Sequence, residues 1–288
     1  MRGYLDVMKG RIVAISCGTY SIMGEGKLYD ASARGIFRKN KQKPLVGDIV
    51  EFNEKEFVIN SIEERFSYLK RPPIANVNQI LLVFSLSEPA FSYYLVCKYL
   101  TYVNYMGIKS YLILTKSDVD NEKEGQSIID NFAKVGVKTF LVSNKTKEGL
   151  DEVKKLFLDK TTCLIGQTGV GKSSLLNAID PKYKREVGEY SEALGRGKHQ
   201  TKEVALLPYQ GGFLADTPGF SSLELDIKEK EVSHYFPGME NEYVNCYFPD
   251  CMHISEGRCK IKEMVKEGII PSIMYECYLK LIKEIKER

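Results

Sequence analysis

Residues 166–173 read Gly166-Gln167-Thr168-Gly169-Val170-Gly171-Lys172-Ser173 and match the pattern G-x-x-x-x-G-K-[S/T] without deviation. An apolar run, Cys163-Leu164-Ile165, precedes them, and a helical pattern over 172–179 follows. Glycines let the backbone wrap closely, so successive N–H groups and the helix N-terminus can cradle phosphates. The pattern therefore predicts a phosphate loop in which Lys172 bridges the β- and γ-phosphates of a nucleotide and Ser173 gives a hydroxyl to Mg²⁺.

A second motif, Thr115-Lys116-Ser117-Asp118, follows the apolar run at 111–114. The carboxylate of Asp118 can accept hydrogen bonds from N1–H and the 2-amino group of guanine, whereas adenine offers no such pair of donors. Lys116 is expected along the purine plane. Thr115 stands where GTPases commonly have Asn, and a hydroxyl makes fewer bonds than an amide, so we expect modest guanine affinity.

The tripeptide Ser143-Asn144-Lys145 follows another apolar run. It is similar to the third guanine element of GTPases, in which a backbone N–H meets the base oxygen. Together with residues 115–118, it predicts a guanine nucleotide as the ligand.

Asp216-Thr217-Pro218-Gly219 matches D-x-x-G, so Asp216 is expected to hold Mg²⁺ through water and the Gly219 N–H to sense the γ-phosphate. The next residue is Phe220 instead of a water-orienting glutamine, which predicts slow intrinsic hydrolysis.

Residues 195–201 lie where the first switch loop of a GTPase belongs, and Thr201 is the candidate for a second Mg²⁺ hydroxyl. His199 either orients the attacking water or is an exposed histidine in a basic loop.

The order of these motifs is rotated, because the guanine motif precedes the phosphate loop and D-x-x-G comes last. Short apolar runs alternate with helical patterns at about 92–106, 122–135, 147–158 and 172–179, as in a parallel α/β sheet with its ligand loops at the strand ends. Residues 69–225 are therefore expected to form a circularly permuted P-loop GTPase domain. Two successive prolines in Arg71-Pro72-Pro73 are expected to stop both helix and sheet at its entry.

Residues 1–68 contain several short strand patterns at 10–15, 27–33, 48–52 and 56–60 and no helix pattern. This spacing predicts a small barrel such as an OB-fold, with an SH3-like barrel as the alternative. Residues 34–43 are strongly basic and carry an aromatic. They are either a solvated turn or part of an RNA-binding surface.

The segment 226–288 contains four potential ligands for a soft metal ion, Cys246, Cys251, His253 and Cys259. Three thiolates and an imidazole favour a structural Zn²⁺, which would replace a core that this segment is too small to build. The alternative is a group of buried thiols beside a surface histidine, or transient disulfides. A helix from Pro271 is expected to bury a face with the four-residue spacing Ile273, Cys277, Leu281 and Ile285.

The chain has 288 residues, enough for two or three cores, and a net charge of +3, which permits a nucleic-acid partner. No run of about 20 apolar residues indicates a membrane span, so we expect a cytoplasmic protein without a membrane partner.

Cys17, Cys97 and Cys163 lie singly in apolar surroundings and are expected to be reduced and buried.

This constellation resembles the ribosome small-subunit-dependent circularly permuted GTPases of bacteria over nearly the whole chain. The likeness rests on the barrel, the segment Arg71–Val77, the motifs at 115–118, 166–174 (which adds Ser174) and 216–219, residues 195–201, and the cysteine cluster. It implies a monomer that binds GTP or GDP with Mg²⁺, and the 30S subunit with its 16S rRNA. It also implies a role in late subunit maturation, with hydrolysis stimulated by the subunit.

Two other interpretations remain open. One is an RNA-binding module whose nucleotide-occupied domain acts as a regulatory clamp with negligible turnover, which Phe220 favours. The other is an ATP-using P-loop enzyme, which Asp118 disfavours.

Overall fold

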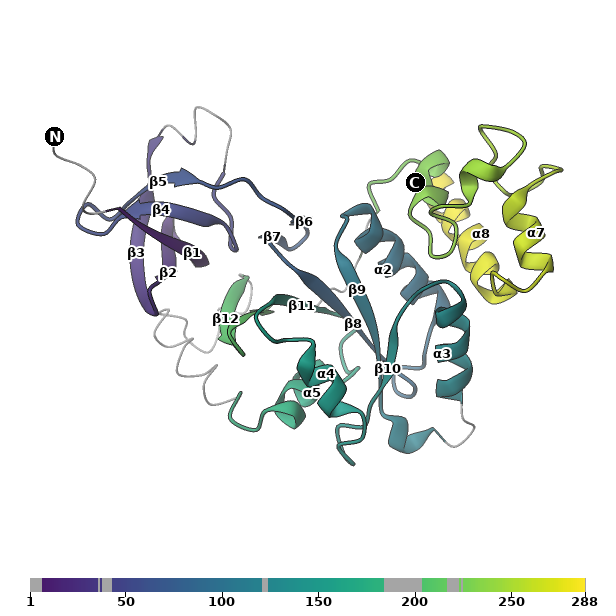
Figure 1. Ribbon diagram of the computed structural model, residues 1–288, viewed down its shortest axis with the longest axis horizontal. Coiled ribbons are helices and arrows are strands. Elements are labelled where there is room, and N and C mark those ends of the chain that lie inside the picture. Colours follow the sequence, from purple (N-terminus) through teal and green to yellow (C-terminus); the bar gives the residue numbers. More distant parts are fainter. Residues whose placement is uncertain are drawn as a thin grey trace. The chain divides into compact units, whose positions relative to one another are not determined.

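The computed structural model describes residues 7–35, 37, 43–120, 124–183, 204–216, 223 and 225–287, with Asp216 described by its backbone alone (Figure 1). The chain forms two compact units. The first comprises Met1–Gln79, Lys154–Leu164 and Asp180–Pro218, and the second Ile80–Val153, Ile165–Ile179 and Gly219–Arg288. Within the described ranges, no helix is long and apolar enough to cross a membrane.

The N-terminal part of the first unit is a five-stranded barrel, as predicted. Its strands are β1 (Val7–Ser16), β2 (Thr19–Gly24), β3 (Lys27–Ala33), β4 (Ile49–Asn53) and β5 (Val58–Ile62). They follow the order β1-β2-β3-β5-β4, and β4 returns to pair with β1. Alternate side chains point inward and form one core of Ile12, Ile22, Ala31, Phe37, Val50, Phe52 and Ile59.

Two features of the barrel were not predicted from the sequence. The patterns missed β2, which buries only two of its six residues fully and so gives a weak apolar signal. Phe37, the aromatic of the basic segment 34–43, is 6% exposed and packs in the barrel core, so it is not available to stack on RNA. Residues 36 and 38–42 lie outside the described residues.

Three more strands of the first unit continue from β1, namely β12 (Ala205–Tyr209), β13 (Gly212–Asp216) and β11 (Thr161–Ile165). β1 and β12 pair antiparallel at Ala14 and Ala205, β12 and β13 form an antiparallel hairpin, and β13 pairs parallel with β11. The patterns missed β12, in which Pro208 interrupts the apolar run.

The two prolines do not stop the sheet, contrary to expectation. Pro73 begins β7 (Pro73–Ala75), which pairs antiparallel with β6 (Tyr68–Lys70) in a two-stranded sheet. Arg71 and Pro72, joined by a cis peptide bond, form the turn between them. A two-stranded ribbon has only edge strands, and a proline is tolerated there because its missing N–H faces away from the partner strand.

The second unit carries the strands β8 (Gln79–Ser85), β9 (Lys109–Thr115) and β10 (Thr139–Leu141), in the order β10-β9-β8 with β10 and β9 parallel. β8 is buried along its whole length, as expected for a strand covered on both faces. The predicted helices are present as α2 (Tyr93–Tyr105), α3 (Glu124–Lys134), α4 (Leu150–Lys155) and α5 (Lys172–Ile179). Edge-to-face contact of Phe84 in β8 with Tyr99 in α2 helps join helix and sheet.

The C-terminal residues form no strand in the described part. They contain the short helices η2 (Glu229–His234), η3 (Tyr243–Asn245) and α7 (Lys260–Lys266), then α8 (Ser272–Lys286). The buried face of α8 differs from the predicted one. It consists of Met274, Cys277, Tyr278, Leu281 and Ile282, while Ile273 is 36% exposed. The three- and four-residue spacings of this face follow the 3.6-residue helical period more closely than a strict spacing of four.

Candidate nucleotide site and metal centre

The phosphate loop lies between β11 and α5, where the motif placed it, and α5 begins at Lys172. Gly166 has no room for a side chain, because a Cβ there would lie 2.0 Å from the carbonyl oxygen of Val83 in β8. Gly169 and Gly171 have φ angles of +84° and +93°, which glycine adopts without steric cost. The loop therefore depends on its three glycines, of which Gly166 and Gly171 belong to the motif and Gly169 does not.

Lys172 folds back over this loop. Its ammonium donates hydrogen bonds to the carbonyl oxygens of Gly166 and Gln167, at 2.7 and 2.8 Å. Burial lowers the pKa of Lys172. Thr168, Ser173 and Ser174 are exposed, so their hydroxyl groups remain accessible to a ligand.

The guanine-type motif is organised around the hydroxyl of Ser143, which is fully buried. This hydroxyl donates to Asp118 Oδ1 at 2.7 Å and accepts from the backbone N–H groups of Lys145 and Thr146, at 3.1 and 3.0 Å. The hydrogen bond from Ser143 lowers the pKa of the exposed Asp118 carboxyl group. The two loops that the sequence placed after different strands are thus joined, and the carboxylate is held ionised.

Thr115 and Lys116 tie the same motif to its neighbours. The buried Thr115 hydroxyl bonds to the carbonyl oxygen of Val170 in the phosphate loop at 2.6 Å and to that of Phe84 at 3.2 Å. Lys116 has a left-handed φ of +64°, and its ammonium donates to the carbonyl oxygens of Ser87 and Glu88.

Asn144 joins the third guanine element to the phosphate loop. Its amide donates to the carbonyl oxygen of Gly171 at 3.3 Å. Among the residues that the structure describes, its buried Oδ1 and the buried Ser117 hydroxyl have no hydrogen-bond partner. The motifs at 115–118, 143–145 and 166–173 are thereby brought into one site.

The remaining predicted nucleotide residues are only partly covered. Asp216 is the last residue of β13, and its backbone pairs with Ala205. His199, Thr201 and Gly219 lie outside the described residues. Their predicted roles stay predictions.

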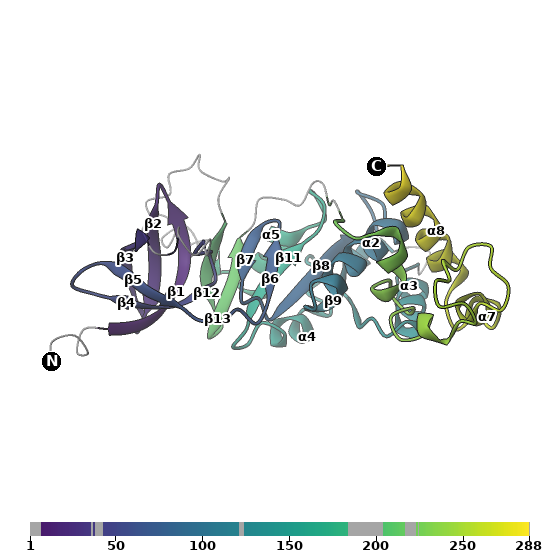
Figure 2. The same cartoon turned by 90° about the horizontal axis from the view of Figure 1, so that it is seen from above.

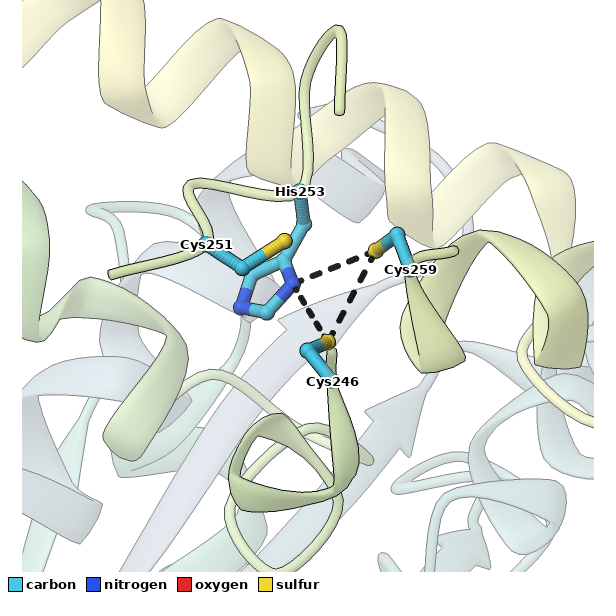
Figure 3. Close-up of side chains that lie close together, drawn as sticks. All are labelled: Cys246, Cys251, His253 and Cys259. Atoms are coloured by element: carbon cyan, nitrogen blue, oxygen red, sulfur yellow. Dashed lines mark hydrogen bonds between the residues drawn. The ribbon is translucent and has the colours of Figure 1, made fainter. Parts of the chain in front are cut away.

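The cysteine cluster forms a compact set of four potential ligands (Figure 3). One atom each of Cys246, Cys251, His253 and Cys259 lies within 4.8 Å of the others. His253 Nδ1 lies 3.4 Å from Cys246 Sγ and 3.3 Å from Cys259 Sγ, and these two sulfurs are 3.8 Å apart. Three sulfurs and one ring nitrogen converging in this way could hold a metal ion.

Residues outside the cluster hold its backbone. The hydroxyls of Tyr275 and Tyr278 in α8 donate to the carbonyl oxygens of His253 and Met252, at 2.6 and 2.9 Å. The Glu256 carboxylate accepts from the N–H groups of Met252 and Ile254, both at 2.8 Å. Sequence reasoning missed these residues, since neither two tyrosines in a helix nor one glutamate has a spacing that marks such a role.

Burial raises the pKa of Cys251 to about 12 and also raises that of Cys259. Without a nearby cation these thiols stay protonated at neutral pH, so the cluster needs a metal ion to hold them as thiolates.

Outside the cluster the cysteine predictions had mixed outcomes. Cys97 and Cys163 are buried as predicted, but Cys17 is exposed. It lies in the turn between β1 and β2 with a φ of +48°, which places it beyond the barrel core.

A small barrel, a phosphate loop and a guanine motif that precedes this loop in the chain define a class of protein, the circularly permuted GTPases. Residues 62–226 match the sequence model of the RsgA GTPase family, and residues 9–57 match that of the RsgA N-terminal domain. The chain belongs to the RsgA GTPase family.

Individual relatives agree with this assignment over the full length. A protein of Halalkalibacterium halodurans named small ribosomal subunit biogenesis GTPase RsgA is 42% identical over 96% of this chain and 97% of its own length. The protein of the same name from Bacillus subtilis is 41% identical over 97% of this chain and 98% of its own.

Solved structures agree as well. YloQ, described as a circularly permuted GTPase, shares 37% identity with a TM-score of 0.83, covering 100% of this chain and 99% of its own. YjeQ from Thermotoga maritima shares 31% identity with a TM-score of 0.85, covering 98% and 99%.

Proposed function

We propose that this protein binds the small ribosomal subunit and assists its late maturation, hydrolysing GTP to GDP and phosphate with stimulation by the subunit. The name of its relatives, small ribosomal subunit biogenesis GTPase, supports the biological role. The hydrogen bond from Ser143 to Asp118 is the observation that carries the choice of nucleotide, because it holds an ionised acceptor beside the phosphate loop.

In this proposal the base is read by residues 115–118 and 143–145. Asp118 accepts two hydrogen bonds from guanine, and the backbone of residues 143–145 meets the base oxygen. Each hydrogen bond to a charged group contributes about 1.5–3 kcal/mol, so this one carboxylate gives a large share of the base selectivity.

The phosphates lie in the loop of residues 166–174. Lys172 leaves the carbonyl oxygens that it now contacts and neutralises the β- and γ-phosphates. Ser173, Thr201 and, through water, Asp216 would hold Mg²⁺, which would supply positive charge to phosphoryl transfer when bound. The Gly219 N–H senses the γ-phosphate, and His199 orients the attacking water.

The metal of the cysteine cluster is proposed to be one structural Zn²⁺ per chain. Three sulfurs and one ring nitrogen are the donors that a tetrahedral zinc site uses, and four protein ligands leave no position for a catalytic water. Cys246, Cys251, His253 and Cys259 thereby cross-link residues 246–259.

Three domains follow from this assignment: an RNA-binding barrel over 1–68, the GTPase domain over 69–225 and a zinc-binding domain over 226–288. The match of separate family models to 9–57 and 62–226 supports the first boundary. The partner is the 30S subunit with its 16S rRNA, which places the protein in the cytoplasm. We propose that it acts as a monomer.

Phosphate release from GTP, measured with and without purified 30S subunits, tests the proposal. We expect the subunit to raise the rate well above its basal value and Lys172→Ala to abolish both rates. Lys182→Ala, an exposed lysine beyond α5, is a charge-matched control that should leave both rates unchanged. A wild-type rate that the subunit does not change, or activity that survives in Lys172→Ala, would support a nucleotide-occupied RNA-binding clamp instead.

The choice of guanine has its own test. Asp118→Asn should weaken GTP binding at least about 100-fold, since both acceptor bonds are disturbed, and should admit xanthosine nucleotides. Competition in the wild type by adenine and guanine nucleotides at equal strength would contradict the assignment.

A further inference from the structure

β1 belongs to two structures at once. Its first half closes the barrel by pairing with β4, from Val7 opposite Asn53 to Arg11 opposite Ile49. Its second half pairs with β12 at Ala14 and Ala205, and β12 forms a hairpin with β13 (Figure 2). The first strand of the barrel is therefore also the neighbour of the hairpin that ends in Asp216.

Arg11 is the last residue of β1 that pairs with β4, and the pairing of β1 with β12 follows at Ala14. Its guanidinium donates to the hydroxyl of Thr161, the first residue of β11, at 2.5 Å. It also lies 5.2 Å from the ring centroid of Phe213 in β13, within the range of a cation–π contact. Thr161 and Phe213 are register partners in the parallel pair of β11 and β13, so one side chain contacts both strands at the same level.

This arginine is half-buried and has no carboxylate partner among the residues that the structure describes. Burial lowers the pKa of Arg11, because removing the guanidinium from water disfavours its charged form. A barrel that merely had to attach to a sheet would do so at lower cost with an apolar residue. We therefore expect the Arg11 guanidinium to do more than attach the barrel strand β1 to β11 and β13.

The two strands that Arg11 contacts are the ones that carry phosphate-binding motifs. β11 continues directly into the loop that starts at Gly166, and β13 ends in Asp216. Asn78 further holds Thr161 at the start of β11, because the Asn78 side chain accepts from the Thr161 N–H at 2.8 Å and the Asn78 N–H donates to the Thr161 carbonyl oxygen at 2.9 Å. Asn78 thus fixes the start of β11 from one side, and a movement of Arg11 would act on the same residue, Thr161.

We propose that Arg11 is a positioning residue for GTP hydrolysis, which transmits docking of the barrel on the ribosomal subunit to β11 and β13 and so raises the rate. The inference rests on the proposed function. It assigns no chemistry to Arg11, which reaches the reacting atoms only through the two strands.

The test compares the basal and the 30S-stimulated GTPase rates of the full-length protein. Arg11→Met keeps a long apolar side chain and removes the guanidinium. We expect the stimulated kcat to fall about 5- to 150-fold, the range of ordinary coupling between sites, while the basal kcat and the affinity for the subunit stay within about twofold. Lys9→Met is the matched control, since Lys9 lies in the same strand, the substitution removes the same charge, and among the described residues the ion pair of Lys9 is the exposed one with Glu63.

Thr161→Val removes the acceptor with little change of shape and should give part of the same loss. The double variant Arg11→Met/Thr161→Val should be no worse than Arg11→Met alone, because both remove one interaction. If Arg11→Met does not fold, Thr161→Val and Phe213→Leu carry the test.

Three results would overturn the inference: an unchanged stimulated rate in Arg11→Met, an equal fall of the basal and stimulated rates, or a loss confined to subunit affinity. If the wild type itself is not stimulated by the subunit, the proposed function fails and the inference falls with it. If the wild type is stimulated and Arg11→Met is stimulated equally, only the inference fails.

Discussion

The guanine loop and the cysteine cluster both gather reactive side chains in a small space, but they are held in different ways. In the guanine loop, residues 115–118 and 143–145, hydrogen bonds within the protein hold the side chains in place. The Ser143 hydroxyl donates to Asp118, and the Lys116 ammonium donates to two backbone carbonyl groups. In the cluster, sulfur and nitrogen atoms 3.3–3.8 Å apart face one another with raised thiol pKa values. Under the proposed function, the first site is formed before the nucleotide binds, whereas the second is completed by its metal ion.

Loss of the metal should therefore have the largest effect. Cys259→Ser removes one thiolate but keeps a side-chain acceptor for the Lys262 N–H at the start of α7. We expect bound zinc to fall from about one to below about 0.1 per chain and residues 246–260 to lose protection against hydrogen exchange. A structural zinc site contributes about 10–16 kcal/mol to folding at neutral pH.

The exposed Cys17 provides the control for this variant, since Cys17→Ser removes a thiol far from the cluster in the sequence and should leave the metal content unchanged. Full protection of residues 246–260 in metal-free Cys259→Ser would show that the cluster is held by packing, as the guanine loop is.

The same contrast explains what could be predicted from the sequence. The phosphate loop, the guanine motif and the cysteine ligands are local patterns whose spacing follows from backbone and coordination geometry. In the structure Thr115 contacts Val170 of the phosphate loop, and the four cysteine and histidine ligands form a separate cluster of their own. The burial of Phe37 and the exposure of Cys17 were not predicted, because both residues lie in connections outside the strands, where no alternating pattern indicates which way a side chain points. Arg11 and Thr161 are 150 positions apart, and no local pattern joins them.

Ser143→Ala should have the next largest effect, confined to the guanine loop. The variant loses the bond to Asp118 and the acceptor for two backbone N–H groups, so GDP affinity at pH 7 should fall about 10- to 30-fold with the metal content unchanged. Fluorescent GDP binding measures this. Ser127→Ala removes an exposed hydroxyl in α3, outside the nucleotide motifs, and is the matched control.

This variant should also change the pH dependence. The bond from Ser143 lowers the pKa of Asp118, so in the wild type the carboxylate stays ionised to unusually low pH. Guanine requires the ionised form, so affinity is present above the folded-state pKa and is lost as the pH falls through it. In Ser143→Ala that pKa rises toward its ordinary value, and the acid loss of GDP binding should begin at higher pH. Parallel pH profiles for the two proteins would contradict this explanation.

Thr115→Val should have the smallest effect and the most specific one. The hydroxyl contacts the Val170 carbonyl oxygen, so its loss should loosen the phosphate loop and weaken GDP about 2- to 10-fold. Guanosine, which has no phosphates, should bind the variant as it binds the wild type. An equal loss for guanosine would mean that Thr115 acts on the base. Asn is the common residue at this position in GTPases, so Thr115→Asn tests further whether position 115 holds the phosphate loop or binds the base. A higher affinity for GDP with no change for guanosine would show that position 115 holds the phosphate loop and that Asp118 binds the base.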